Sequence, residues 1–186
     1  MAHLLPFRFS TLLCLTLALL LSGCCANSVC DCQDEEADAI RLHFARGFSS
    51  TEADTVIIQR SPLPYQATNK FESVTLIRTA ARFRDTIVIN NNTPFAQAGT
   101  TKLNGYRYEV QYLVPKPKSK PVPTTVLVID SVRLRGSLDG SGCCTCYTNT
   151  AKTVFALRAR RNSTTPDSAL VVDLKQAPRQ SIELTK

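Results

Sequence analysis

Hydrophobic and polar residues alternate along most of the chain after Ala39, as expected for strands that bury one face. The longest run is Tyr106–Val114, where Tyr and Val fill every second position and mostly polar residues lie between them. Ile40–Phe44 alternates in the same way. The pattern predicts further strands at Thr55–Gln59, Val74–Thr79, Thr86–Asn90, Thr125–Arg135, Thr153–Arg158, Leu170–Leu174 and Ser181–Leu184.

Turn-forming residues separate these runs. Ser61–Pro64 and Asn90–Pro94 each follow a predicted strand, and Asn104-Gly105 precedes the tyrosine-rich one. One helical turn is expected at Ser49–Ala53, where Ser49 and Glu52 fit a capping box. About nine short strands with close turns predict an all-β fold: a single antiparallel β-sandwich, immunoglobulin-like or transthyretin-like.

The segment Pro115–Pro123 carries a proline at nearly every second position, with lysines between. Such spacing disfavours a strand ladder and favours polyproline II. We expect a stiff, basic loop here, either a solvated hairpin tip or a contact surface for an anionic partner.

The first residues follow another pattern. Arg8 and the amino terminus precede an apolar run from Phe9 to Leu21, which has the length of a signal-peptide core and is too short to span a bilayer of roughly 30 Å of hydrocarbon. Leu21-Ser22-Gly23-Cys24 follows. These four residues resemble the lipobox of bacterial lipoproteins. The alternative is an ordinary signal peptide cleaved near Ala26.

The lipobox resemblance implies diacylglycerol on the Cys24 thiol, cleavage before Cys24, and an acyl group such as palmitate on the new amine. Several acyl chains hold a protein stably on a membrane. The implied organisation is a signal peptide at 1–23, a lipidated, Cys-containing acidic tether at 24–38 and the sandwich at 39–186. The implied location is the cell envelope, at the outer membrane, facing the periplasm or the cell surface.

Charge is distributed unevenly. Five of the 15 acidic residues lie before Ala39, whereas 21 of the 22 Lys and Arg residues lie after it. Asp34-Glu35-Glu36 resembles a sorting signal that some Gram-negative bacteria place after the lipid cysteine; the alternative is a plain solvated tether. The basic remainder is a solvated surface or a site for an anionic glycan or an envelope protein. No motif for nucleic-acid recognition is present, so nucleic acid is not an expected partner.

Six cysteines remain once Cys14 leaves with the signal peptide and Cys24 carries lipid: Cys25, Cys30, Cys32, Cys143, Cys144 and Cys146. Disulfides are expected in an exported chain. Residues two apart on a strand point to the same side, so two bridges between the clusters would attach the N-terminal segment to Gly142–Tyr147. Cys143 then pairs with Cys25 or stays free.

The same sulfurs allow a second interpretation. Cys30, Cys32, Cys143, Cys144 and Cys146 together offer thiolates to copper(I) or zinc. The spacings C-x-C and C-C-x-C differ from the C-x₂-C usual for structural zinc.

Four sites share the order Asp, then Ser or Thr, then an apolar residue. This order resembles an O-glycosylation sequon of Gram-negative bacteria with surface lipoproteins, and it would place glycan on Thr55, Thr86, Ser131 and Ser168. The alternative is a turn entering a strand, where Asp with Ser or Thr is also common.

Catalytic motifs are missing from the sequence. His43 is the only histidine of the predicted mature chain, and no phosphate-binding loop, HExxH motif or paired-carboxylate signature accompanies it. We therefore expect a non-enzymatic envelope lipoprotein without a cofactor, whose sandwich serves binding or assembly. The alternative is a thiolate metal-binding envelope protein.

Overall fold

The computed structural model describes residues 30, 32–116, 118–141, 143–159, 168–175 and 180–186. These residues form two compact units. The smaller unit contains the described residues up to Asp34 and those of Leu138–Thr148; the larger contains the described residues of Glu35–Ser137 and Asn149–Lys186. The predicted signal peptide, Cys24 and Cys25 lie outside the described residues.

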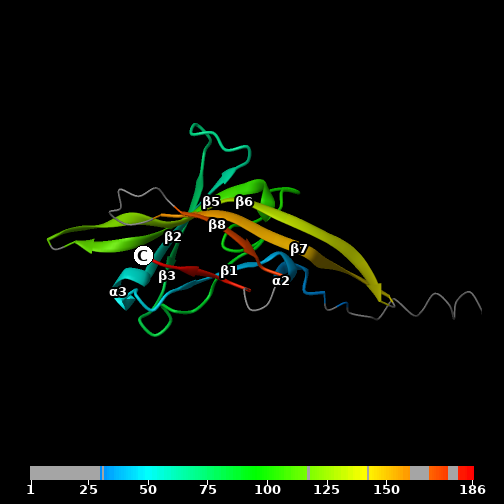
Figure 1. Cartoon of the computed structure of the whole chain (residues 1–186), viewed down its shortest axis with the longest axis horizontal. Coiled ribbons are helices and arrows are strands. Elements are labelled where there is room, and N and C mark those ends of the chain that lie inside the picture. Colours follow the sequence, from blue (N-terminus) through cyan, green and yellow to red (C-terminus); the bar gives the residue numbers. More distant parts are fainter. Residues whose placement is uncertain (1–29, 31, 117, 142, 160–167, 176–179) are drawn as a thin grey trace, which may run out of the picture. The chain divides into compact units, whose positions relative to one another are not determined.

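Two sheets account for the strands of the described residues (Figure 1). The strands are β1 (Ile40–Phe44), β2 (Thr55–Pro62), β3 (Glu72–Ile77), β4 (Ile87–Ile89), β5 (Tyr106–Lys116), β6 (Ser119–Ser141), β7 (Cys144–Arg158), β8 (Ser168–Asp173) and β9 (Ile182–Leu184). The large sheet has the order β3-β2-β5-β6-β7-β8 and the small sheet β4-β1-β9. Short helices α2 (Asp34–Asp38), α3 (Ser50–Ala53) and η1 (Leu103–Gly105) complete the described elements.

The predicted all-β sandwich of about nine strands is confirmed. Pairing is antiparallel between β2 and both of its neighbours, between β5 and β6, and between β7 and β8. The pair β1–β9 is parallel, with Leu42 opposite Ile182. These strands lie at opposite ends of the domain sequence, so no short hairpin dictates their relative direction.

The inward faces of both sheets form one hydrophobic cluster in the larger unit. Burial alternates along β1, β2 and β5, as the sequence pattern predicts. Tyr108 and Tyr112 of β5 are among the largest fully buried side chains. Phe48, which follows β1, packs edge-on against Tyr112 with ring centroids 5.1 Å apart, and so joins the two sheets.

The proline-rich segment is not the predicted loop. β5 and β6 remain paired through it: Leu113 lies opposite Pro123, and Val114 opposite Val122. β2 accompanies β5 only as far as Tyr112, so β5 has a neighbour on one side only beyond that point. Prolines spaced by two all lack their N–H on the same side of a strand, and the open side tolerates that loss. The prediction was wrong because β5 and β6 stay paired as a hairpin beyond the point where β2 ends its pairing with β5.

The capping box before α3 is confirmed. The Ser49 N–H donates to Glu52 Oε2 at 3.0 Å, and Lys186 Nζ lies 2.7 Å from the same oxygen. Burial raises the pKa of Glu52, but the hydrogen bonds from Lys186 and Ser49 outweigh it and lower the pKa to about 2. The Glu52–Lys186 pair therefore persists well into the acid range.

The start of β5 is fixed by a buried tyrosine hydroxyl. Tyr108 Oη donates to the Leu103 carbonyl, 3.1 Å away and five residues upstream. Greek-key sandwiches use a similar contact, the tyrosine corner, to secure the chain where it enters a strand. Burial also raises the pKa of Tyr108, which keeps the hydroxyl protonated as a donor.

Tyr108→Phe is expected to lower the free energy of unfolding by about 1–2 kcal/mol, because the Leu103 carbonyl loses its donor. Tyr112→Phe is the matched control. Tyr112 Oη is buried and has no hydrogen-bond partner among the described residues, so its removal is expected to be neutral or stabilising. Urea denaturation of both variants measures the difference. Equal losses would contradict the role given to the Tyr108 hydroxyl.

Candidate functional site

Two disulfides lie in the smaller unit. Cys30 is bonded to Cys144, and Cys32 to Cys146. The Cα atoms are 5.4 Å apart in the first pair and 5.2 Å apart in the second. The expectation of two bridges between the cysteine clusters is therefore confirmed.

Both bridges have a sequence separation of 114 residues. An equal separation means that the segment around Cys30 and Cys32 runs in the same direction as the start of β7. The spacing of two residues places both sulfurs of each segment on one side, as it does in a strand. Cys143 is disulfide-bonded as well, whereas Cys25, the partner that the sequence offers it, lies outside the described residues.

The disulfides bear on the second interpretation of the cysteines, in which their thiolates bind copper(I) or zinc. Metals bind thiolates, and a sulfur in a disulfide has no thiolate to offer. Among the residues that the structure describes, no group of three or more His, Cys, Asp or Glu side chains is placed to hold a metal ion.

A buried carboxylate anchors the chain where it enters the larger unit. Asp38, the last residue of α2, is 1% exposed. Asn149 Nδ2 donates to its Oδ1 at 2.7 Å, and Asn91 Nδ2 donates to its Oδ2 at 3.2 Å. Lys102 Nζ lies 3.9 Å from Oδ2 and supplies opposite charge.

The backbone next to Asp38 is held from β7. Asn149 Nδ2 also donates to the Ala37 carbonyl at 2.6 Å, and Lys152 Nζ donates to the carbonyls of Ala37 and Ala39 at 3.0 and 2.8 Å. Burial and the nearby charge of Arg41 lower the pKa of Lys152. Residues 34–38, which the sequence assigns to the tether, thus form a helix, and Ala37 and Asp38 are bonded to β7.

Asn149 and Lys152 were missed by the sequence analysis, although one signal points to the lysine. Lys152 is in phase with Val154 and Ala156, which face the core. A lysine at an inward position needs acceptors for its ammonium hydrogens. Its acceptors are backbone carbonyls, which no sequence pattern identifies.

The four sequon residues differ in exposure. Thr86 is exposed immediately before β4, whereas Thr55, Ser131 and Ser168 are half-buried within β2, β6 and β8. His43 lies half-buried on β1, with Nε2 4.0 Å from a carboxylate oxygen of Glu183.

Comparison with protein-family models, curated proteins and solved structures found no match. Among the described helices, none has the length and apolar character needed to cross a membrane.

Asp38→Asn is expected to lower the free energy of unfolding by about 2–3 kcal/mol, because an amide nitrogen would meet a hydrogen-bond donor where a carboxylate oxygen now accepts. Asp139→Asn, at an exposed position, is the control and is expected to change stability little. Chemical denaturation measures both. Similar small effects in the two variants would refute the anchoring role of Asp38.

The two bridges are expected to contribute non-additively to stability. Either alone closes a loop of more than 100 residues, which contributes about 4.7 kcal/mol in the chain-entropy model, whereas the second bridge closes a ring of a few residues and adds about 2 kcal/mol. Removing both should therefore cost more than twice as much as removing one.

Denaturation of serine variants tests this, in a background where Cys25 and Cys143 are also serine so that no third bridge keeps the loop closed. One variant changes Cys30 and Cys144, another changes Cys32 and Cys146, and the last changes all four. Costs that simply add would contradict the shared loop.

Proposed function

We propose that this chain is a non-enzymatic lipoprotein of the bacterial cell envelope, anchored by acyl chains on Cys24. In this proposal the β-sandwich serves as a binding or assembly module. Cysteines six and eight residues after the proposed lipid cysteine form disulfides, and this is the observation that carries the proposal. Disulfides persist in compartments such as the periplasm or the cell surface, which is where a lipobox directs a chain.

The proposed anchor is short. Six residue steps separate Cys24 from Cys30, and an extended chain spans at most about 3.6 Å per residue. Cys30 therefore lies within about 22 Å of the acylated residue, and the Cα atom of its partner Cys144 on β7 is 5.4 Å from that of Cys30. A lipoprotein built this way keeps its smaller unit near the bilayer surface.

A third bridge, between Cys25 and Cys143, belongs to this proposal. Cys143 is disulfide-bonded, and the bridges already named use the other four cysteines of the described residues. Of the remaining three, Cys14 leaves with the signal peptide and Cys24 carries lipid, so Cys25 is the partner left. The cysteine next to the lipid would then be attached to the same region as Cys30 and Cys32.

The rival function, thiolate metal binding, requires these bridges to be reduced. In an oxidising compartment the bridged form is the expected one. A metal centre is therefore the weaker proposal.

Of the four sequon residues, we propose Thr86 as the one that carries O-glycan. An acceptor hydroxyl must be accessible to the transferase, and Thr86 is the exposed residue of the four. Thr86→Ala should abolish a mass increment seen on the mature protein in a host that glycosylates this sequon. Ser131→Ala is the matched control and should leave the increment unchanged. An increment that persists in Thr86→Ala would overturn this choice.

Cys24→Ala is expected to shift the protein from the membrane pellet to the soluble fraction of a Gram-negative host and to remove the acyl mass. Cys25→Ser is the control and should stay membrane-bound, since it changes the neighbouring cysteine alone. Fractionation in high salt and intact-mass measurement give both readouts. A Cys24→Ala protein that remains in the salt-washed membrane would refute the anchor.

A further inference from the structure

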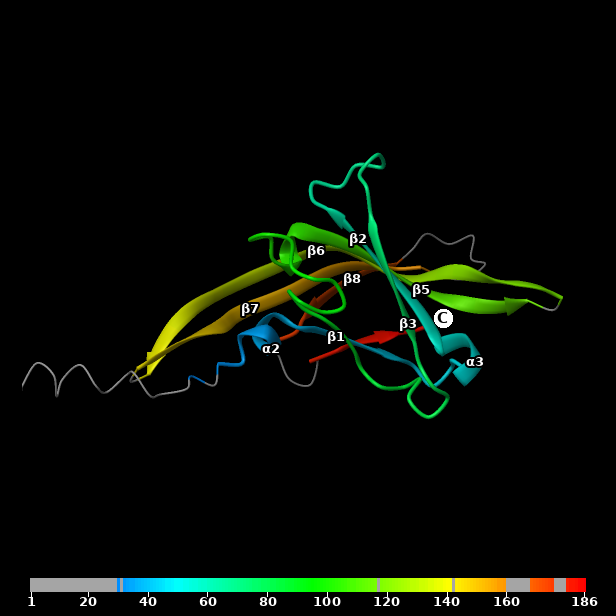
Figure 2. The same cartoon turned by 180° about the vertical axis from the view of Figure 1, so that it is seen from behind.

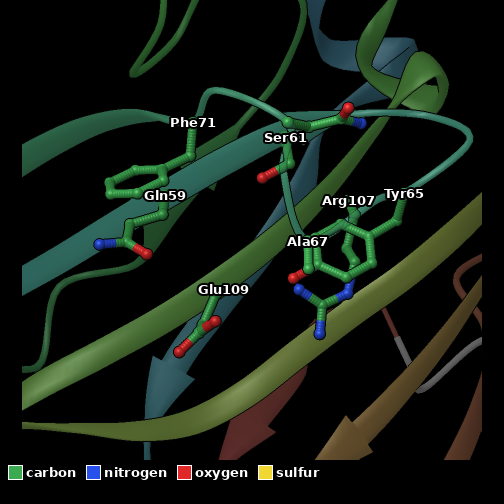
Figure 3. A pocket seen from close by; sticks show the side chains of 8 residues that line it. Gln59, Ser61, Tyr65, Ala67, Phe71, Arg107 and Glu109 are labelled. Carbon is green, nitrogen blue, oxygen red and sulfur yellow. The ribbon is translucent and has the colours of Figure 1, made fainter.

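An open pocket of about 210 Å³ lies in the larger unit, on the outward face of the large sheet (Figure 3). Its floor comes from β2 and β5, and its rim from the loop between β2 and β3. This loop stands out from the sheet both in Figure 1 and in Figure 2, which shows the reverse side. None of the hydrogen bonds and disulfides described in the preceding subsections involves a residue that lines this pocket.

The floor is polar because alternate residues of the two strands face outward. Gln59 lies opposite Glu109, and Ser61 lies opposite Arg107, in the antiparallel register. The pairing therefore places an amide, a hydroxyl, a guanidinium and a carboxylate side by side (Figure 3).

Glu109 is oriented in advance for a ligand. Its Oε1 accepts hydrogen bonds from Gln111 Nε2, at 2.8 Å, and from Thr125 Oγ1. Within the described residues no hydrogen bond reaches Oε2, so this oxygen of a pocket-lining residue is left as an acceptor for a ligand. Holding a carboxylate in one orientation before binding reduces the entropy cost of recognising a hydroxyl.

Two aromatic rings stand at the rim. Tyr65 is 49% exposed and Phe71 is 59% exposed. The Arg107 guanidinium stacks on Tyr65, with its carbon 4.4 Å from the ring centroid, and thereby fixes that ring. Exposed aromatic rings beside a polar floor are typical of a binding surface.

The rim loop is braced by hydrogen bonds within the chain. Asn69 Nδ2 donates to the carbonyls of Pro62 and Pro64, at 3.2 and 3.1 Å, across the base of the loop. Leu63 N–H donates to the Gly105 carbonyl at 2.9 Å. These bonds hold the loop that carries Tyr65 and Phe71, so the loop needs little rearrangement when a ligand binds.

We propose that this pocket binds one neutral sugar ring of a glycan. Sugar hydroxyls both donate and accept, which suits the carboxylate, amide and guanidinium of the floor. The C–H face of a sugar is apolar and fits against an aromatic ring. The volume is below the roughly 300–1,000 Å³ usual for drug-sized ligands, and the open side lets a longer glycan continue outward.

Charge argues for a neutral ring over a polyanion. Arg107 is already shared with Asp130, whose Oδ1 lies 3.7 Å from Nε, and Glu109 stands beside it. The Glu109 carboxylate at the floor of the pocket would repel a phosphate, whereas it would not repel a neutral sugar hydroxyl. The inference deepens the proposed binding function, but it does not depend on the lipid anchor, which the Cys24 variant tests separately.

Saturation-transfer NMR of the full-length protein tests the proposal, in a zwitterionic detergent that has no sugar headgroup. The probes are the methyl glycosides of glucose, galactose, mannose, xylose, fucose and N-acetylglucosamine, with inorganic phosphate added as a competitor. At least one glycoside is expected to bind with a Kd of about 1 mM, typical of weak recognition. Phosphate is expected not to displace it.

Phe71→Ala and Glu109→Gln are each expected to weaken this binding about tenfold or more. Glu109→Gln keeps an acceptor at Oε1 for Gln111 and Thr125 and replaces only the oxygen assigned to the ligand, so the fold should be retained. Glu183→Gln on β9 is the matched control and should bind normally. The proposal fails if no glycoside binds at about 10 mM, ten times the expected Kd. It also fails if phosphate displaces the sugar, or if both variants bind like the parent.

Discussion

The buried carboxylate of Asp38 is the interaction on which the larger unit depends. It accepts from Asn149 on β7 and from Asn91 in the loop after β4, and these bonds replace its lost hydration. Asn91 Oδ1 accepts from the Leu103 N–H, and the Leu103 carbonyl accepts from Tyr108. One chain of hydrogen bonds thus joins α2, the loop after β4 and β5. A buried charge with several donors tolerates few other geometries, so this network fixes how α2, the loop after β4 and the start of β5 lie together.

The disulfides give the preceding segment a second constraint. Their existence was predictable, because two clusters with a spacing of two residues can form two strand-like bridges. The strands were also predictable: alternation marks β1, β2 and β5 within a few residues of their ends. What these features share is a local pattern. Periodicity and spacing are encoded within a few residues, so the sequence alone reveals them.

The features that the sequence did not reveal depend on neighbours distant in the chain. Pro123 is paired with Leu113 because the hairpin extends beyond β2, and the strand order decides this. Arg60 points inward yet is stabilised by ring stacking, between Phe95 at 4.6 Å and Tyr106 at 4.4 Å. The pocket has the same origin, because its floor exists only when β2 and β5 are adjacent. Local propensity cannot predict such contacts.

The central claim is that disulfides attach the segment after the proposed lipid cysteine to β7, so that this segment is not a free linker. A protease cut next to the bridges tests this claim. A cleavage site is inserted between Gln33 and Asp34, and the lipidated protein is bound to vesicles and cut. A variant lacking Cys25, Cys30 and Cys32 serves as the control and should be released by the cut alone. We predict that the cut parent protein stays with the vesicles until a reductant is added, because the bridges to β7 still join the two pieces. Release of the parent by the protease without reductant would contradict the account.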